Sequence, residues 1–319
     1  MKLHFIAYFI GTLLFIKPLH CDATMYAKDV LPCKQNKKTQ SKKQVKTEDQ
    51  HLEGFSVWEL SKTSDFKDNF FPIKEKGHIY SQALGMEYKV NEGFNVGAFY
   101  LFDRLNARTP INTSKLHENI NSFYPYFYYY FMPGFFLNVV AGYGHTATKI
   151  KQIDDSTGMA ILGKSKGNIQ AFIPSLVGQM EQDNFLADVY LNYLYYSYKE
   201  KSYVESNSNV VPSSRTTRNN LELLANIGYR FKDIGSGVKS ISPYVILGID
   251  HDVKPTKIRS PFLASVGQKF NRGRSGYTGG ALINVLFAND AMLELKYKYT
   301  YGHSHLKINT YSLNLRFNF

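Results

Sequence analysis

The sequence has no long apolar run. None of its 319 residues lies in a stretch of about 18 consecutive apolar residues, and its mean hydropathy is −0.30. A helix needs about 20 predominantly apolar residues to span a bilayer, so no permanent helical anchor is predicted. This absence leaves open chains that cross a membrane as strands, because only alternate residues of such a strand face lipid.

Cysteine is also scarce, with two residues in the chain, Cys21 and Cys33. Lys2 followed by the apolar stretch Phe5–Ile16 predicts a signal peptide over residues 1–23, with cleavage after Ala23. Acylation of Cys21 would need small residues before it, where leucine and histidine stand. A mature chain with one cysteine has no intrachain disulfide and no cysteine-based metal site, and no cofactor is expected.

Acidic residues are too few to balance the basic ones. Lys and Arg number 38 against 26 Asp and Glu, which gives a formal net charge of +12. Six of the lysines lie between Lys34 and Lys46 with no aromatic residue among them. Such a block is usually a solvated face, so nucleic acid is not an expected partner. Residues 24–52 are predicted to be a lysine-rich linker or a segment that enters a pore.

Alternation of apolar and polar residues dominates the rest of the chain. From Leu293 to Tyr301 every second residue is leucine or tyrosine, and the residues between them are polar. Tyr311–Phe319 repeats this period of two, which is typical of a strand with one face in an apolar medium. A soluble sandwich also alternates. However, Tyr and Phe make up 24 and 23 residues, and many lie near strand ends, as in the aromatic girdles of transmembrane barrels.

Residues 53–319 therefore predict an all-β fold, a transmembrane antiparallel β-barrel of about twelve strands. The predicted strands begin at Gly54, Tyr80, Phe94, Asn119, Phe135, Asn168, Phe185, Asn219, Pro243, Gly276, Leu293 and Tyr311. Long polar loops are expected at about 64–76, 106–116, 149–165, 199–217 and 254–275, and short turns at Asn91, Pro133, Gln182, Asp233 and Asn289. Short turns of bacterial barrels face the periplasm.

One local pattern breaks the alternation. Before Tyr311, the apolar residues Leu306 and Ile308 fall on the face that is polar in the rest of the strand. The sequence predicts a β-bulge there, or an exit of the strand from the membrane.

Several segments together resemble the autotransporter β-domain of Gram-negative outer membranes. They are Val57–Leu60, Ala83–Phe102, Ser242–Asp252 and the closing stretch Leu293–Phe319. The resemblance implies a twelve-stranded barrel of type V secretion with a helix threaded through its pore. Such proteins carry a long passenger before the barrel, whereas about 30 mature residues precede Gly54 here, so little or no passenger is expected. It also implies the outer membrane as location, with outer-membrane lipid and the barrel-assembly machinery as partners; no soluble partner is indicated.

Two groups of residues are candidates for function. Charged residues on the polar face of the strands are expected to line the lumen, because a charge on the lipid face is costly. They are Glu87, Lys89, Asp103, Asp188, Glu222, Arg230, Glu294, Lys296, Lys298 and Arg316. The second group resembles the C-terminal signal read by the barrel-assembly machinery, and it comprises Phe319, Phe317, Leu315 and Tyr311.

No catalytic or metal site is predicted. His303-Ser304-His305 lacks a third group that would orient a histidine for an outer-membrane hydrolase. Asp250, His251 and Asp252 are consecutive on a strand, so the three cannot point to one place. The leading hypothesis is an autotransporter-type barrel that is not an enzyme. A small solute channel is the alternative, and an outer-membrane hydrolase is a weaker one.

Overall fold

The structure is a computed structural model of the chain, and it describes residues 54–69, 75–108, 114–154, 157–235, 237–259, 274–303 and 305–319. The predicted signal peptide, the lysine-rich segment and Ser304 lie outside these residues. No helix among the described residues is long and apolar enough to cross a membrane.

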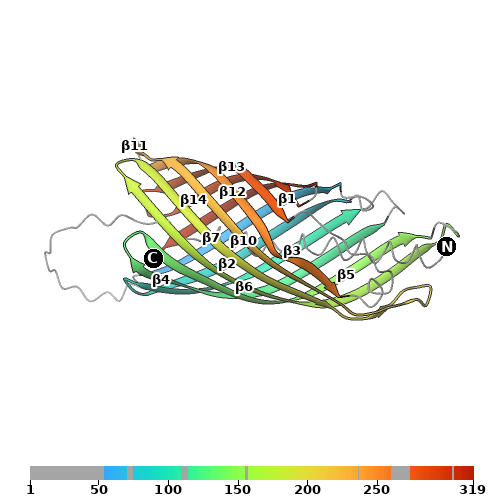
Figure 1. The fold of residues 1–319 in the computed structure, drawn as a ribbon. Helices are drawn as coiled ribbons and strands as arrows, with labels where there is room; N and C mark the ends of the chain where they lie inside the picture. Colours follow the sequence, from blue (N-terminus) through green and yellow to red (C-terminus); the bar gives the residue numbers. More distant parts are fainter. Residues whose placement is uncertain are drawn as a thin grey trace.

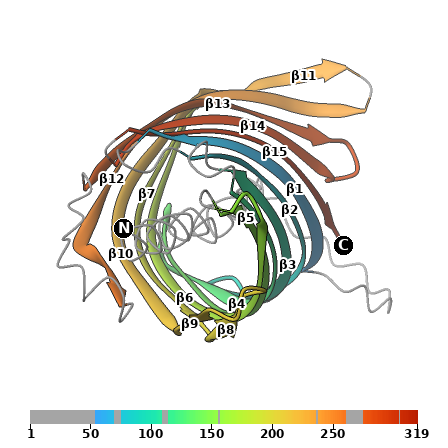
Figure 2. The same ribbon diagram turned by 90° about the vertical axis from the view of Figure 1, so that its right-hand side faces the viewer.

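Twelve antiparallel strands form one closed barrel (Figures 1 and 2). They are β1 (Phe55–Asp68), β2 (Glu75–Asn91), β3 (Phe94–Arg108), β4 (Lys115–Met132), β5 (Phe135–Ile153), β6 (Ala160–Gln182), β7 (Phe185–Glu200), β10 (Ser214–Tyr229), β12 (Val238–Arg259), β13 (Ser275–Phe287), β14 (Met292–Gly302) and β15 (Leu306–Asn318). Each strand pairs with its neighbours along the chain, and β15 pairs with β1 to close the ring. The predicted fold class and strand number are confirmed.

Three short strands lie outside the ring. β8 (Tyr203–Val204) and β9 (Val210–Val211) form a hairpin in the loop between β7 and β10. β11 (Phe231–Gly235) pairs with the start of β12 and projects beside the barrel (Figure 2). The prediction of a turn at Asp233 is therefore wrong, because Asp233 lies within β11, which forms a hairpin with the start of β12.

The other short turns lie where the sequence predicts them, at one end of the barrel. Residues with left-handed backbone dihedrals stand in three of them: Gly134 with φ 80°, Asp183 with φ 55° and Asp290 with φ 64°. Glycine and aspartate tolerate this conformation better than most residues. The longer connections lie at the opposite end (Figure 1).

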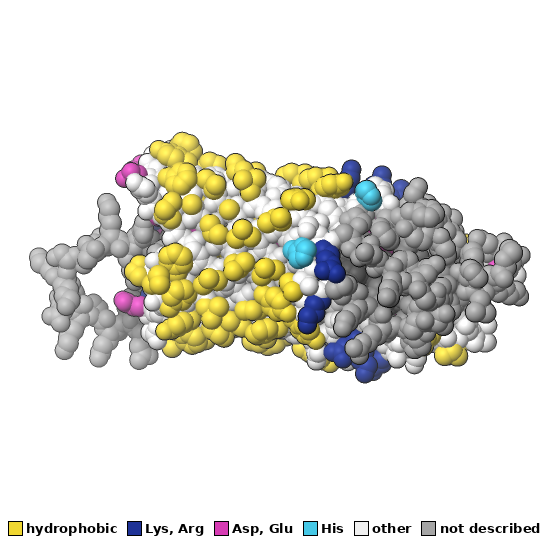
Figure 3. All heavy atoms as spheres, in the orientation of Figure 1, with side chains coloured by type: hydrophobic (Ala, Val, Ile, Leu, Met, Phe, Trp, Pro, Cys, Tyr) yellow, Lys and Arg dark blue, Asp and Glu magenta, His cyan; other side chains and the backbone are white. Residues whose placement is uncertain are grey.

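The outer face carries a belt of apolar side chains near the short turns (Figure 3). Leu84, Leu247 and Phe317 are examples, with 61%, 54% and 48% of their surface exposed. An apolar outer band flanked by polar residues is what a barrel needs in lipid. Acidic side chains lie beyond one edge of the belt and Lys, Arg and His side chains beyond the other (Figure 3).

The strands extend beyond this belt into segments for which the sequence predicted loops. β1 continues to Asp68 and β2 begins at Glu75, inside the predicted loop 64–76. β6, β10 and β12 likewise reach into predicted loops. In these extensions the pattern is reversed: Phe66 is buried, and its neighbours Asp65 and Lys67 are exposed. The medium outside the strands is water rather than lipid there, so the outer face becomes charged.

The same reversal explains Leu306 and Ile308. β15 pairs with both β14 and β1 in continuous register across these residues, so of the two predicted alternatives the β-bulge is wrong. Both side chains instead turn inward and join an apolar cluster with Phe66 and Ile79 at the long-loop end of the barrel. Side chains still point alternately inward and outward along the strand, but here the apolar ones point inward and the polar ones outward.

Candidate functional site: the inner wall of the barrel

One side of the inner wall is lined with aromatic rings. Phe99 on β3 stacks on Tyr124 of β4 at a centroid distance of 4.8 Å and 13° between planes, and it also contacts Trp58 of β1 at 5.4 Å. Tyr126 and Tyr128 continue the series along β4 at 5.4 Å. The sequence assigns many tyrosine and phenylalanine residues to girdles at the membrane boundaries, and it does not predict this series of rings on the inner wall. Its signal was the run of alternate tyrosines at 124, 126, 128 and 130.

Glycines make room for the largest of these rings. A Cβ atom at Gly85 would come within 2.2 Å of the Trp58 indole, and one at Gly142 within 2.0 Å of the Tyr124 ring. Neither position can carry a side chain unless the ring moves. The aromatic series therefore depends on glycines on the adjacent strands.

A hydrogen-bonded ion pair lies beside the aromatic series. The Arg316 Nη2 atom donates to Glu87 Oε1 at 2.9 Å and to Ser56 Oγ at 2.8 Å. Glu87 also accepts from Asn95 Nδ2 at 3.1 Å and from the Tyr126 hydroxyl at 3.3 Å. Both charged side chains are at least nine-tenths buried, and each is satisfied by several partners, as buried charges require.

This network joins the two ends of the folded chain. Arg316 lies on the last strand, Ser56 on the first and Glu87 on the second. Because β15 pairs with β1 to close the ring, these contacts connect the two closing strands with each other and with β2. We therefore infer that it stabilises the closed form of the barrel.

A second ionic cluster lies on another part of the inner wall. Arg218 Nε on β10 donates to Asp252 Oδ1 at 2.8 Å, and Asn220 Nδ2 donates to Asp250 Oδ2 at 3.0 Å. His303, just after β14, contacts Asp250 Oδ2 through its Nε2 atom at 2.5 Å. The cluster links β10, β12 and the end of β14 near the long-loop end.

This second cluster refines the sequence argument about Asp250, His251 and Asp252. His251 points to the outer face, where its Nδ1 atom lies 3.0 Å from Ser275 Oγ, so the three residues do not converge. The two aspartates do share the inner face, and they meet Arg218 and His303 from other strands. Sequence reasoning could not find this, because it requires the register of β10 against β12. No group of three His, Cys, Asp or Glu residues suited to a metal ion is found in the described part of the chain.

Nine of the ten charged residues predicted for the lumen lie on the inner face of their strands, and Arg230 directly follows β10. Glu87, Asp103, Glu294, Lys298 and Arg316 are buried, and Lys89 is exposed near a short turn. The structure brings some of them together with other polar groups. Lys296 Nζ lies 2.8 Å from Glu294, Arg230 Nη1 donates to Glu181 at 2.6 Å, and Glu222 accepts from Asn192 at 2.9 Å.

The four residues predicted as an assembly signal point outward. Tyr311, Phe317 and Phe319 have 50%, 48% and 65% of their surface exposed, and Leu315 is half-buried. The Phe319 amide donates to the Phe55 carbonyl at 2.8 Å, and the Phe319 carbonyl accepts from Gly54. The last residue of the chain is thus hydrogen-bonded to the start of the first strand.

One acid interrupts the apolar belt. Glu59 on β1 pairs with Leu84 on one side and Leu315 on the other, and its side chain is exposed. Gln82 Nε2 donates to its Oε1 atom at 3.0 Å. A carboxylate that faces lipid is unfavourable, although less so than Lys or Arg.

Replacing Glu59 by leucine is expected to stabilise the barrel by about 1 kcal/mol, because a charged group leaves the lipid face. Urea unfolding of the refolded protein in lipid vesicles measures this. The control is Glu92→Leu in the exposed turn between β2 and β3, where little change is expected. Destabilisation by Glu59→Leu would contradict the lipid-facing assignment of β1.

Comparison with known proteins finds similarity in structure alone. Neither a family model nor a curated protein matches the sequence. Among solved structures, the translocator domain of the autotransporter NalP from Neisseria meningitidis matches with a TM-score of 0.67 at 14% identity, over 85% of this chain and 90% of that one. The chain has the fold of an autotransporter translocator domain.

Two further structures support the translocator fold. The β-domain of the Bordetella autotransporter BrkA matches with a TM-score of 0.62 at 15% identity, over 84% of this chain and 100% of that one. The transport unit of AIDA-I from Escherichia coli matches with a TM-score of 0.52 at 12% identity, over 86% and 93%. Identities this low show a shared fold, and the sequence resemblance is confirmed at that level.

Proposed function

We propose that this chain is an integral protein of the outer membrane of a Gram-negative bacterium and serves there as an autotransporter-type translocator rather than as an enzyme. The observation that carries the proposal is the closed twelve-strand ring, matched over its length by three translocator domains. The apolar belt supports the membrane location, and a signal peptide over residues 1–23 would deliver the chain across the inner membrane.

The proposed role requires that the segment before β1 passes through the barrel to the cell surface. The test is an epitope tag inserted after Ala23 in the full-length chain, detected with antibody on intact cells. We expect surface labelling. The matched control carries the same tag at Gly93, in a short turn, where the proposed topology places it in the periplasm and no labelling is expected. An unlabelled N-terminal tag in a correctly inserted barrel would contradict translocation.

A small solute channel is the second candidate, because the inner wall carries charges of both signs. The two functions differ in whether the pore conducts. If Lys34–Lys46 enters the pore, as the sequence predicts, acidic wall residues such as Glu222 and Glu294 attract it strongly in a confined lumen. This segment lies outside the described residues.

Deletion of Thr24–Gln50 is then expected to raise single-channel conductance in planar bilayers, because the pore loses the segment that fills it. A heat-modifiable gel shift of the variant serves as the folding control. High conductance of the full-length chain, unchanged by the deletion, would favour the channel and remove the pore-filling role of the segment.

A further inference from the structure

Six basic residues form an unbroken row across the outer face of the barrel. They occupy directly paired positions on six adjacent strands, from β15 through β1 to β5. In order they are Lys307, Lys67, Lys76, Arg108, Lys115 and Lys151. We call this set the basic row. Its members come from six separate strands, so it is visible only once the register is known.

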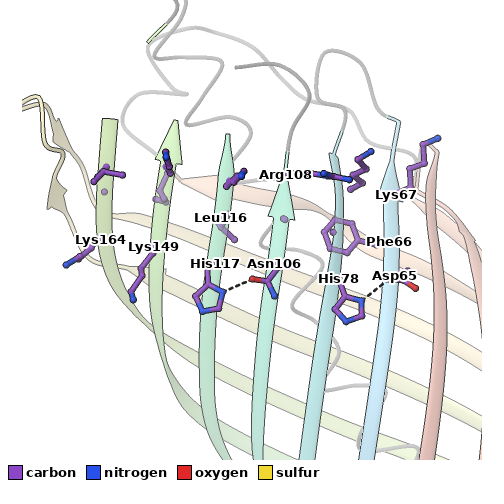
Figure 4. A pocket seen from close by; sticks show the side chains of 18 residues that line it. Asp65, Phe66, Lys67, His78, Asn106, Arg108, Leu116, His117, Lys149 and Lys164 are labelled. Carbon is purple, nitrogen blue, oxygen red and sulfur yellow. Dashed lines mark hydrogen bonds and ion pairs between the residues drawn. The ribbon is translucent and has the colours of Figure 1, made fainter. Parts of the chain in front are cut away.

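A second row of polar residues lies next to it, on the side of the apolar belt. His78 Nδ1 contacts Asp65 at 2.8 Å and His117 Nδ1 contacts Asn106 at 2.7 Å, while Lys149 follows on β5 (Figure 4). Apart from Lys307, the two rows line a hollow of about 860 Å³ across β1 to β6. Its described lining residues all come from these strands.

The charge of this hollow is strongly unbalanced. Its lining includes seven Lys or Arg residues and two histidines, but one acid, Asp65, which is engaged by His78. Among the described residues no salt bridge ties a member of the basic row to a carboxylate. Like charges directly opposite each other on neighbouring strands destabilise a sheet. Folding alone therefore does not account for the row, and a bound anion would offset its cost.

Where it crosses β15, β1 and β2, the row lies at the height of lipid headgroups. The lipid-facing part of β2 runs from Tyr80 to Val90, so Lys76 is nine residues from its middle. Nine residues span about 30 Å along a strand, which a tilt of about 45° converts to about 20 Å along the membrane normal. The headgroup region lies about 15–22 Å from the bilayer centre. Lys67 and Lys307 are at a similar height.

The tilt of the strands also decides which residues reach the membrane at the other end of the row. Because paired positions run perpendicular to tilted strands, the row rises away from the membrane toward Lys151. There the second row, with His117 and Lys149, lies nearer to the headgroups. Burial lowers the pKa of His117, and the charges of Arg104 and Lys149 lower it further.

We propose that the basic row and the adjoining hollow bind the phosphate groups of anionic lipids in the leaflet that surrounds the long-loop end of the barrel. Lysine and arginine bind phosphate through charge-assisted hydrogen bonds, and spaced cations can hold more than one phosphate. The site requires only the transmembrane barrel and is independent of translocation.

The test measures lipid binding by native mass spectrometry of the full-length barrel in detergent. The probes are phosphatidic acid, which carries a phosphate monoester, and phosphatidylcholine, whose headgroup has no net charge. We expect the wild type to retain phosphatidic acid in preference. Replacing both Lys67 and Lys76 by glutamine should weaken phosphatidic acid binding by about 30-fold, from about fivefold for each surface cation.

The matched control removes two cations from the short-turn end, Lys232→Gln with Lys239→Gln, and should change binding less than about twofold because neither lies in the row. Both variants are checked for folding by the heat-modifiable gel shift. Equal losses in the two variants, or equal retention of both lipids by the wild type, would overturn the proposal. Displacement of phosphatidic acid by millimolar inorganic phosphate, or preferred binding of a polyanion such as heparin, would also overturn the assignment to lipid.

Discussion

Replacing Arg316 by methionine will lower the free energy of unfolding of the barrel by about 3 kcal/mol or more. The substitution keeps most of the aliphatic volume but leaves the Glu87 carboxylate buried without its cation. It also removes the donor to Ser56 across the seam between the first and last strands. Urea unfolding in lipid vesicles, followed by tryptophan fluorescence, measures the loss, and Trp58 is well placed because its Nε1 atom donates to Tyr126 in the same network.

Arg230→Met is the matched control for this experiment. Arg230 also forms a pair on the inner wall, with Glu181 at 2.6 Å, but both partners retain some exposure to solvent and the pair does not join the terminal strands. Its loss should cost about 1 kcal/mol. The double variant Glu87→Gln, Arg316→Met should recover part of the stability, because no buried charge is left unpaired. Equal effects of Arg316→Met and Arg230→Met would show that the seam network has no special role.

Replacing Phe319 by aspartate will lower the amount of folded barrel in the outer membrane by about tenfold, whereas export across the inner membrane continues. A closed barrel has no free edge, so the last strand must be delivered to the first before the ring forms. Phe319 hydrogen-bonds with Phe55 and Gly54, and its ring lies 6.4 Å from that of Phe55. Aspartate keeps the backbone hydrogen bonds but places a charge where an aromatic side chain faces outward.

The measurement is the fraction of protein that shows a heat-modifiable gel shift in the outer-membrane fraction. Phe319→Tyr is the control and should assemble normally, since it keeps an aromatic ring. A second comparison uses purified protein refolded in detergent, where Phe319→Asp should fold nearly as well as the wild type if the residue acts mainly in delivery. Normal assembly of Phe319→Asp in cells would remove the proposed signal and leave the barrel unaffected.

The membrane-spanning parts of the fold were predictable from sequence because their alternation is local. In β14 the outward Leu293, Leu295 and Tyr297 and the inward Glu294 and Lys296 follow directly from a period of two. The strand extensions were not predictable in the same way. Phe66 lies in a segment that the sequence predicts to be a loop, so its place on the inner face was not predicted. At Leu306 and Ile308 the break in the alternation was visible, but the sequence left a β-bulge and an exit from the membrane as alternatives.

The contacts between distant strands were the least predictable part. Arg316 and Glu87 are separated by 229 residues, and the sequence indicated only that each faces the lumen. The convergence of Arg218, Asp250 and His303 and the alignment of the basic row both depend on register. Register is set by the whole ring of paired strands, so no single segment contains it.

The most direct test of the account is which side chains of β14 face lipid. Single cysteines, each labelled with a fluorophore, replace residues 293 to 297 one at a time in a chain whose Cys21 and Cys33 have been changed to serine, and the proteins are refolded into vesicles that contain brominated lipid. The account predicts strong quenching at Leu293, Leu295 and Tyr297 and weak quenching at Glu294 and Lys296. Equal quenching at all five positions, or quenching at none of them, would contradict a transmembrane barrel.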